Sequence, residues 1–184
     1  MDNHDLDRVY SVLGEDWKKL RMGINWLLTL RGIPQLYYGT EVLMKNLKTG
    51  SHAAVREDFP GGWADDKEKD NRFTRKGRND KENEAFDYVS GLANFRKNSS
   101  AICRGRTMQF IPRDGVYIYF RYDDKQTIMV ISNTGDKTIK PDWTIYNERT
   151  KGFTRLQNVV SGKIRVLNDF DIEPKESFVF ELLK

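Results

Sequence analysis

The first residues of the chain carry the side chains with the clearest potential for chemistry. Asn3, His4 and Asp5 are adjacent, and Arg8 follows four residues after the histidine. A histidine next to an aspartate, with an arginine close by, is typical of part of an active site. The same residues could also form an exposed polar stretch at a mobile terminus. Their types alone leave both interpretations open.

A second candidate group is the string "REDFPGGW" at residues 56–63. Its Pro-Gly-Gly sequence predicts a tight turn, with Phe59 on one side and Trp63 on the other. Aromatic faces stack on sugars or on bases, so both rings are candidate ligand contacts. The alternative is that both rings are tucked under the loop. Arg56 is interpreted either as a donor to ligand hydroxyls or as a brace within the loop.

The composition limits the classes of function that need to be considered. The chain has 31 basic and 27 acidic residues, a net charge of +4 and a pI of about 9.1. A basic nucleic-acid-binding domain is an alternative, but the charge is not of one sign and no nucleic-acid partner is expected. One cysteine and two histidines exclude a disulfide framework, a multi-cysteine zinc site and a His-rich metal site. No apolar run is long enough to span a membrane.

Hydrophobic periodicity divides the chain into two parts. It predicts helices over residues 16–31 and 82–96. Between them, residues 33–38 form a short apolar run typical of the strand of a β/α unit, and residues 40–80 have no clear period. From about residue 104, short alternating runs separated by turn residues predict a small antiparallel sandwich. Its strands are expected in a hairpin over residues 115–133, then at 137–140, 144–147, 153–156, 163–167 and 177–182.

The predicted strand at residues 33–38 raises a physical difficulty. A β/α strand needs parallel neighbours on both edges, and no other β/α strand is found in the sequence. It therefore pairs with the β-domain or with another chain, or its neighbours lie outside this sequence. Exposed apolar surface on this strand and on the helix at residues 16–31 would be covered by a homodimer, by strand exchange, or by packing on residues 82–97.

Several blocks resemble the α-amylase family of glycoside hydrolases. "DNHD" at 2–5 resembles the family's fourth conserved region, at the end of barrel strand seven, and "GIPQLYYGTE" at 32–41 resembles the strand-eight block. The segments at 55–63 and 71–97 are similar to neopullulanases and cyclomaltodextrinases, particularly the neopullulanases of bacterial starch-utilisation systems. The segment at 101–122 resembles the entry into their C-terminal domain. The four ordered blocks together cover essentially the whole chain.

The resemblance implies an α+β fragment. Residues 1–101 would be the end of a (β/α)8 TIM barrel, comprising helix seven, strand eight, a long loop and helix eight. Residues 102–184 would be the antiparallel C-terminal β-sandwich. The N-terminal part of the barrel would precede residue 1 and would be a partner of this chain, which also supplies the missing neighbours of residues 33–38.

The resemblance also implies a retaining α-glycosidase that hydrolyses α-1,4 bonds in pullulan, cyclodextrins or malto-oligosaccharides. Asp5 would be the third catalytic carboxylate, which stabilises the transition state. The nucleophilic aspartate and the acid glutamate would lie upstream, so the chain alone is expected to be inactive. The residues expected to bind substrate are His4, Arg8, Arg56, Phe59 and Trp63.

No metal site and no cofactor are expected in this chain, and calcium, bound in some relatives, would use mainly absent segments. The location would be periplasmic if the protein is like the starch-utilisation neopullulanases, and otherwise cytoplasmic. An alternative function is a non-catalytic module, whose sandwich binds carbohydrate or only packs against the barrel.

Overall fold

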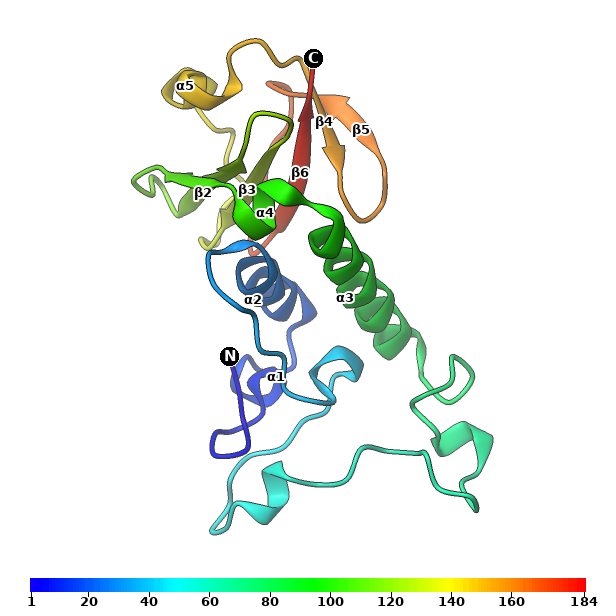
Figure 1. The fold of residues 1–184 in the computed structure, drawn as a ribbon. Coiled ribbons are helices and arrows are strands. Elements are labelled where there is room, and N and C mark those ends of the chain that lie inside the picture. Colours follow the sequence, from blue (N-terminus) through cyan, green and yellow to red (C-terminus); the bar gives the residue numbers. More distant parts are fainter. The chain divides into compact units, whose positions relative to one another are not determined.

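The computed structural model describes residues 1–184, which fold into two compact units (Figure 1). Unit 1 consists of Met1–Leu20 and Pro34–Ser90, and unit 2 of Arg21–Ile33 and Gly91–Lys184. The helices are α1 (Val9–Val12), α2 (Trp17–Thr29), α3 (Asp80–Asn98), α4 (Ser100–Arg104) and α5 (Asn147–Thr150), with 3-10 turns at Thr40–Val42, Ala53–Val55, Glu68–Asp70 and Trp143–Tyr146. The strands are β1 (Arg106–Gln109), β2 (Val116–Tyr122), β3 (Thr127–Asn133), β4 (Arg155–Asn158), β5 (Ile164–Val166) and β6 (Ser177–Leu183).

Unit 2 is built on one antiparallel sheet with the strand order β1-β2-β3-β6-β4-β5. The predicted hairpin is confirmed, since β2 and β3 pair along their whole length around the turn at Asp123. Ile118 lies opposite Ile131, and Phe120 lies opposite Met129, so these side chains share one face. Alternation of this kind places every second residue of each strand in the core.

The main core lies on one face of this sheet. Apolar side chains from β2, β3, β4 and β6 meet residues from the 3-10 turn and the loops between β3 and β6. Trp143, Tyr146, Leu167 and Ile172 supply this opposing layer. The β-domain is antiparallel, as expected, but its second layer consists of turns and loops instead of a second sheet, because β6 bonds to both β3 and β4 and joins all strands in one sheet.

The other face of the sheet contacts α2 through a buried polar layer. The Asn25 side chain donates to Ser177 Oγ at 2.9 Å, and Trp26 Nε1 donates to Ser132 Oγ at 3.0 Å. Ile24 is fully buried. Within unit 1, the start of this helix packs on α3, where the Trp17 ring meets the edge of Tyr88 at 5.8 Å and Trp17 Nε1 donates to Glu84 at 2.9 Å. The predicted packing on residues 82–97 is therefore confirmed for this part of the helix, whereas a homodimer or strand exchange stays a prediction.

Two of the predicted strands of the β-domain are not formed. Residues 144–147 belong to the 3-10 turn and α5, because the Asp142 side chain accepts a hydrogen bond from the Thr144 amide at 3.0 Å and caps a helical turn. Residues 137–140 make only an isolated bridge, between Ile139 and Ile172. Conversely, β1 and α4 were not predicted, and each is only four or five residues long.

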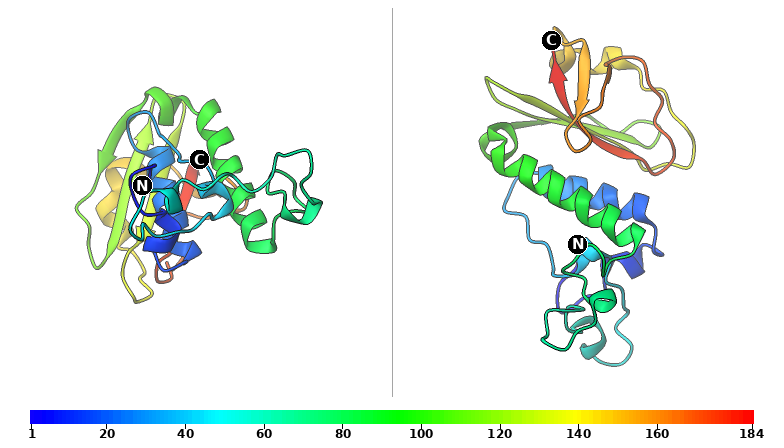
Figure 2. Two further views of the ribbon diagram at one scale, coloured as in Figure 1. Left: turned by 90° about the horizontal axis from the view of Figure 1, so that it is seen from below. Right: turned by 90° about the vertical axis from the view of Figure 1, so that its right-hand side faces the viewer.

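The strand predicted at residues 33–38 is also not formed. This segment is irregular coil in Figure 2, and all six strands of the chain lie after residue 105. A strand exists only through hydrogen bonds to a neighbour, and no other segment of the chain supplies one. Ile33 is 99% exposed as a result. The α+β class is confirmed, since the chain combines these helices with one antiparallel sheet.

None of the helices is long and apolar enough to cross a membrane.

Candidate functional site

Asp5 lies at the centre of a polar cluster in unit 1. Its Oδ1 is 2.7 Å from Arg56 Nη2 and 3.2 Å from His52 Nδ1, and its Oδ2 is 3.2 Å from His4 Nε2. Arg56 Nε also donates to the His4 carbonyl at 2.8 Å. The cluster therefore joins the start of the chain to the long loop, and its side chains remain about half exposed.

The partners of Asp5 control its ionisation. Partial desolvation raises the pKa of the Asp5 carboxyl, but the hydrogen bond from Arg56 and the charges of His4, Arg56 and His52 lower it more strongly. The net result is a pKa below the usual range of an aspartate. Asp5 is thus an anion at neutral pH, with exposed oxygens that can accept hydrogen bonds from a ligand.

Replacing Arg56 by Gln is expected to raise the pKa of Asp5, because the strongest favourable partner of the carboxylate is removed. A carboxyl with a lowered pKa stabilises the fold above its unfolded pKa, and that contribution is lost as the pH falls through the folded pKa. The contact between Asp5 and the loop is therefore expected to break on acidification. Carboxyl 13C NMR titration measures both effects. Arg155→Gln is a matched control, since the Arg155 side chain donates to the Lys184 carbonyl within unit 2. An unchanged Asp5 pKa in Arg56→Gln would contradict the prediction.

Arg8 lies apart from this cluster and is buried, with 1% of its surface exposed. Its Nη1 donates to the Tyr38 carbonyl at 2.6 Å. Its guanidinium carbon lies 4.2 Å from the centre of the Tyr37 ring and 4.6 Å from that of Tyr38, which are cation–π distances. Arg8 is therefore packed in the protein interior against these two tyrosines, and its contact with substrate stays a prediction.

The two tyrosines connect Arg8 to the loop that carries Arg56. Tyr37 Oη donates to the Val55 carbonyl at 3.3 Å, and Tyr38 Oη donates to the Glu57 carbonyl at 2.6 Å. These carbonyls are on the residues that directly precede and follow Arg56. A continuous set of contacts therefore runs from Arg8 through the tyrosines and the loop to the partner of Asp5.

Glu41 is the last residue of the segment at 32–41 that also contains Tyr37 and Tyr38, and it is more buried than Asp5. Burial raises the pKa of the Glu41 carboxyl, whereas backbone hydrogen bonds and the positive charge of Arg8 lower it by smaller amounts. A buried carboxylate near a buried cation is typical of a structural brace. The arrangement therefore favours a supporting role for Glu41 beside Arg8.

The structure brings together three of the residues singled out from the sequence and separates the others. His4, Asp5 and Arg56 are in direct contact. Phe59 packs on Phe73, with ring centres 4.5 Å apart, instead of joining this cluster. The Trp63 side chain is 65% exposed on the same loop.

His52 is a member of the cluster that sequence reasoning missed. It is the residue before the 3-10 turn at Ala53–Val55, and this turn brings its ring close to Arg56 at 3.3 Å. The spacing of four residues between His52 and Arg56 was the available signal. It indicates a contact only in a helical segment, and the loop has no periodicity that predicts one. No group of three or more His, Cys, Asp or Glu side chains in the chain is arranged to hold a metal ion.

Comparison with known proteins identifies two family regions. Residues 1–100 match the family described as "Alpha amylase, catalytic domain". Residues 107–181 match the "Cyclo-malto-dextrinase C-terminal domain". The first match alone covers more than half of the chain, and the two follow each other in the order expected from the sequence.

Individual relatives agree with this assignment. The chain is 30% identical to a cyclomaltodextrin glucanotransferase of Geobacillus stearothermophilus, over 96% of this chain and 23% of that protein. It is 33% identical to an alpha-amylase of Niallia circulans, over 72% of this chain and 21% of that protein. The chain thus spans about a fifth of the length of the curated relatives it matches.

Solved structures show the same fold. The structure of AmyP E221Q in complex with maltotriose superposes with a TM-score of 0.74 at 21% identity, over all of this chain and 40% of that one. The trehalose-6-phosphate hydrolase of Bacillus licheniformis gives 0.72 at 20% identity, over all of this chain and 42% of that one. With the family matches over both regions, these likenesses show that the chain belongs to the alpha-amylase family of glycoside hydrolases.

Proposed function

We propose that this chain forms part of a retaining α-glycosidase and that Asp5 is its transition-state-stabilising carboxylate. The observation that carries the proposal is the ionised, half-exposed Asp5 carboxylate, surrounded by Arg56, His4 and His52 in a chain of the alpha-amylase family. In a retaining mechanism the sugar passes through an oxocarbenium-like transition state. A fixed anion stabilises this positive charge more than it stabilises the neutral substrate.

The remaining groups of the cluster have complementary roles in this proposal. His4 donates to a hydroxyl of the reacting sugar beside Asp5, and Arg56 keeps the carboxylate ionised. Because Oδ1 already has Arg56 and His52 as neighbours and Oδ2 has only His4, a sugar hydroxyl has most room at Oδ2. Arg8 and the tyrosines beneath the loop hold Arg56 in position.

The nucleophilic aspartate and the acid glutamate belong to segments outside residues 1–184 in this proposal. Residues 1–101 contribute the end of the catalytic barrel, and residues 102–184 form the C-terminal domain. The complete enzyme hydrolyses α-1,4 bonds in pullulan, cyclodextrins or malto-oligosaccharides. Residues 33–38 then pair with the remainder of the barrel, which accounts for their exposed Ile33 and their lack of a strand partner.

The proposal is tested by measuring hydrolysis and binding separately with maltoheptaose. The chain alone is expected to release no reducing sugar, because two of the three carboxylates are not part of it. By NMR titration, the resonances of Asp5 and His4 are expected to shift with the sugar, and Asp5→Asn is expected to abolish the shift. Asp124→Asn changes an exposed carboxylate in the hairpin turn and serves as the control.

Two results would contradict the proposal. Turnover of the sugar by the purified chain, abolished by Asp5→Asn, would mean that the chain contains a complete active site. Sugar-induced shifts that persist unchanged in Asp5→Asn would mean that Asp5 does not contact the sugar.

A further inference from the structure

We propose that Phe73, together with Phe59, forms a second carbohydrate-binding surface on the long loop of unit 1, which takes the apolar face of an α-glucan chain. The inference rests on the proposed function for the class of ligand, but it uses no residue of the Asp5 cluster. Phe73 was not singled out from the sequence. Phe73 is 64% exposed, in a stretch that is otherwise rich in charged residues.

The loop closes so that the two phenylalanines lie side by side. The Arg72 amide donates to the Pro60 carbonyl at 2.8 Å, which joins the two ends of the segment between them. Phe59 directly precedes this closure and Phe73 directly follows it. Their ring centres are 4.5 Å apart, and their planes are inclined by 45°. The pair forms a continuous aromatic surface with an exposed side.

The glycine turn supports the Phe73 ring from beneath. A Cβ added to Gly62 would lie 2.9 Å from Phe73 Cε2, so the bare backbone of this residue touches the ring. Gly62 also has a φ of +99°, which a residue with a side chain adopts only with strain. Trp63 follows at once, and its amide donates to Asp66 Oδ2 at 2.7 Å, which fixes the backbone beside the ring.

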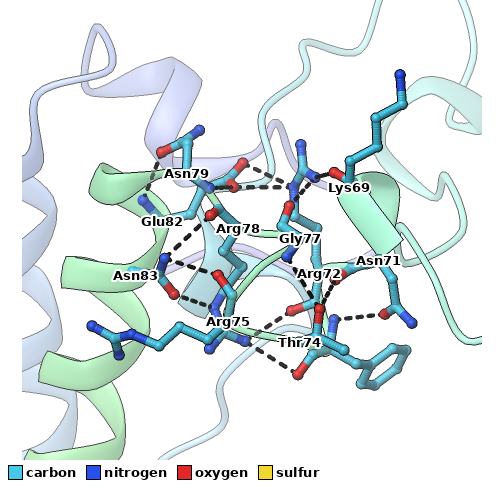
Figure 3. Close-up of polar contacts among 11 residues, drawn as sticks. Lys69, Asn71, Arg72, Thr74, Arg75, Gly77, Arg78, Asn79, Glu82 and Asn83 are labelled. Carbon is cyan, nitrogen blue, oxygen red and sulfur yellow. Dashed lines mark hydrogen bonds and ion pairs between the residues drawn. The ribbon is translucent and has the colours of Figure 1, made fainter. Parts of the chain in front are cut away.

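A cage of polar contacts fixes the backbone that carries Phe73 (Figure 3). Arg78 Nη1 donates to the carbonyls of Arg72 and Phe73 at 2.9 and 3.3 Å, and Arg78 Nε donates to Asn83 Oδ1 at 3.0 Å. Because Asn83 belongs to α3, these bonds attach the loop to a helix. The Arg78 side chain is itself buried, which makes this attachment strong.

Arg72 completes the cage from the same loop. Its Nε lies 3.0 Å from Glu82 Oε2, and its Nη1 donates to the carbonyls of Lys69 and Gly77. A Cβ on Gly77 would lie only 1.9 Å from the Asn71 carbonyl oxygen, so the backbone packs too closely there for any other residue. Because these contacts hold the backbone of Phe73 firmly, its exposed ring loses little conformational entropy when a ligand binds.

The chemistry of this surface favours a glucan. Single exposed apolar residues are common on protein surfaces, but a supported ring pair on a braced loop is a preorganised contact. A pyranose presents C–H groups on its faces, and these groups match the aromatic surface. The Asn71 side chain lies beside Phe73, since its Oδ1 accepts a hydrogen bond from the Phe73 amide at 3.0 Å, and its amide nitrogen can donate to a hydroxyl at the edge of the sugar. A nucleic acid would need a positive field, whereas residues 65–81 carry both signs of charge.

The test is calorimetric titration of the 184-residue chain with maltoheptaose. Phe73→Ala is expected to weaken binding about tenfold, and Phe73→Tyr is expected to retain it, because the ring is preserved. Gly62→Ala is expected to weaken binding as well. The new methyl group would displace the Phe73 ring, although the ring itself is unchanged. Ile111→Ala is the matched control, because Ile111 is 84% exposed in unit 2.

Asp5→Asn separates this inference from the proposed function. Binding that is weakened by Phe73→Ala and kept in Asp5→Asn supports the aromatic surface, whatever the role of Asp5. Binding that is lost in Asp5→Asn and unaffected by Phe73→Ala overturns the surface and leaves the proposed function standing. Absence of any heat with millimolar maltoheptaose also overturns it, as does Phe73-dependent binding of an oligothymidylate in place of the sugar.

Discussion

Replacing Phe180 by Ala is expected to lower the free energy of unfolding of the chain by about 3–5 kcal/mol. Phe180 is 1% exposed in the centre of β6, where it lies opposite Met129 of β3 and Asn158 of β4. Its ring stacks on Phe178 at 5.4 Å and meets the edge of Phe170 at 5.8 Å. The substitution removes all of these contacts and leaves a cavity where the two halves of the sheet join.

The loss is a large fraction of the stability of an ordinary domain, which is about 5–15 kcal/mol, so unit 2 of the variant is expected to unfold at a much lower urea concentration. Urea denaturation followed by near-ultraviolet circular dichroism measures the change. Ile111→Ala removes an exposed apolar side chain of the same unit and is expected to shift the free energy by about 0.5 kcal/mol at most. A Phe180→Ala midpoint equal to that of Ile111→Ala would show that the core does not depend on this ring.

The sequence predicted those parts of the fold whose signal is local and periodic. The spacing of Leu20, Ile24 and Leu28 predicted α2, and the alternation around Asp123 predicted the β2–β3 hairpin. Residues 144–147 were predicted as a strand because they form one of several short runs that turn residues separate. The Asp142 cap decided the outcome there, through one hydrogen bond that the apolar pattern does not contain.

The elements that depend on distant partners were less predictable. Whether residues 33–38 form a strand is decided by a neighbour, and alternation within the segment carries no information about that neighbour. The polar contacts of α2 with Ser132 and Ser177 join segments more than 100 residues apart, so no sequence window reveals them. The same holds for the joining of all strands into one sheet through β6.

The candidate site divides in the same way. The residue types at His4 and Asp5 were visible as a pair, and the family resemblance assigned them a role. Their contact with Arg56 joins residues about 50 positions apart, with α1 and α2 between them, and only the fold establishes it. His52 was missed because that loop has no period, and Phe73 because a lone phenylalanine among charged residues gives no signal of an exposed ring.

Replacing Arg8 by Met is expected to destabilise unit 1 by about 2 kcal/mol, as the balance of two opposing effects. Methionine fills most of the volume, but the Tyr38 carbonyl loses its donor and both tyrosine rings lose a cation. The opposing effect is that Nη2 of the buried guanidinium has no hydrogen-bond partner. Removing this poorly solvated charge stabilises the fold and offsets part of the loss. The 2.6 Å bond and two ring contacts outweigh this gain.

The same substitution is expected to change two carboxyl groups in a way that simple loss of packing would not. Without Arg8, the pKa of Glu41, already raised by burial, rises further. Ionised Glu41 then lowers the stability of the variant at neutral pH. A carboxyl whose pKa is raised in the folded state stabilises the fold below its unfolded pKa, and this contribution is lost as the pH rises through the folded pKa. Mild acid is therefore expected to restore part of the stability of the variant. The tyrosines loosen the loop around Arg56, so the pKa of Asp5 rises toward its usual range.

Thermal unfolding and carboxyl NMR titration of Arg8→Met measure these changes together. Arg31→Met is the matched control, because Arg31 is an exposed cation of unit 2. If the variant loses stability and the pKa of Asp5 stays low, Arg8 braces only the tyrosines. If the pKa of Asp5 rises as it does in Arg56→Gln, the contacts from Arg8 to Asp5 act as one unit. Arg8 would then determine how firmly the Asp5 carboxylate is held in position, although Arg8 itself is buried. The reason is that the rigid supports of a site set the geometry of the groups that bind the ligand.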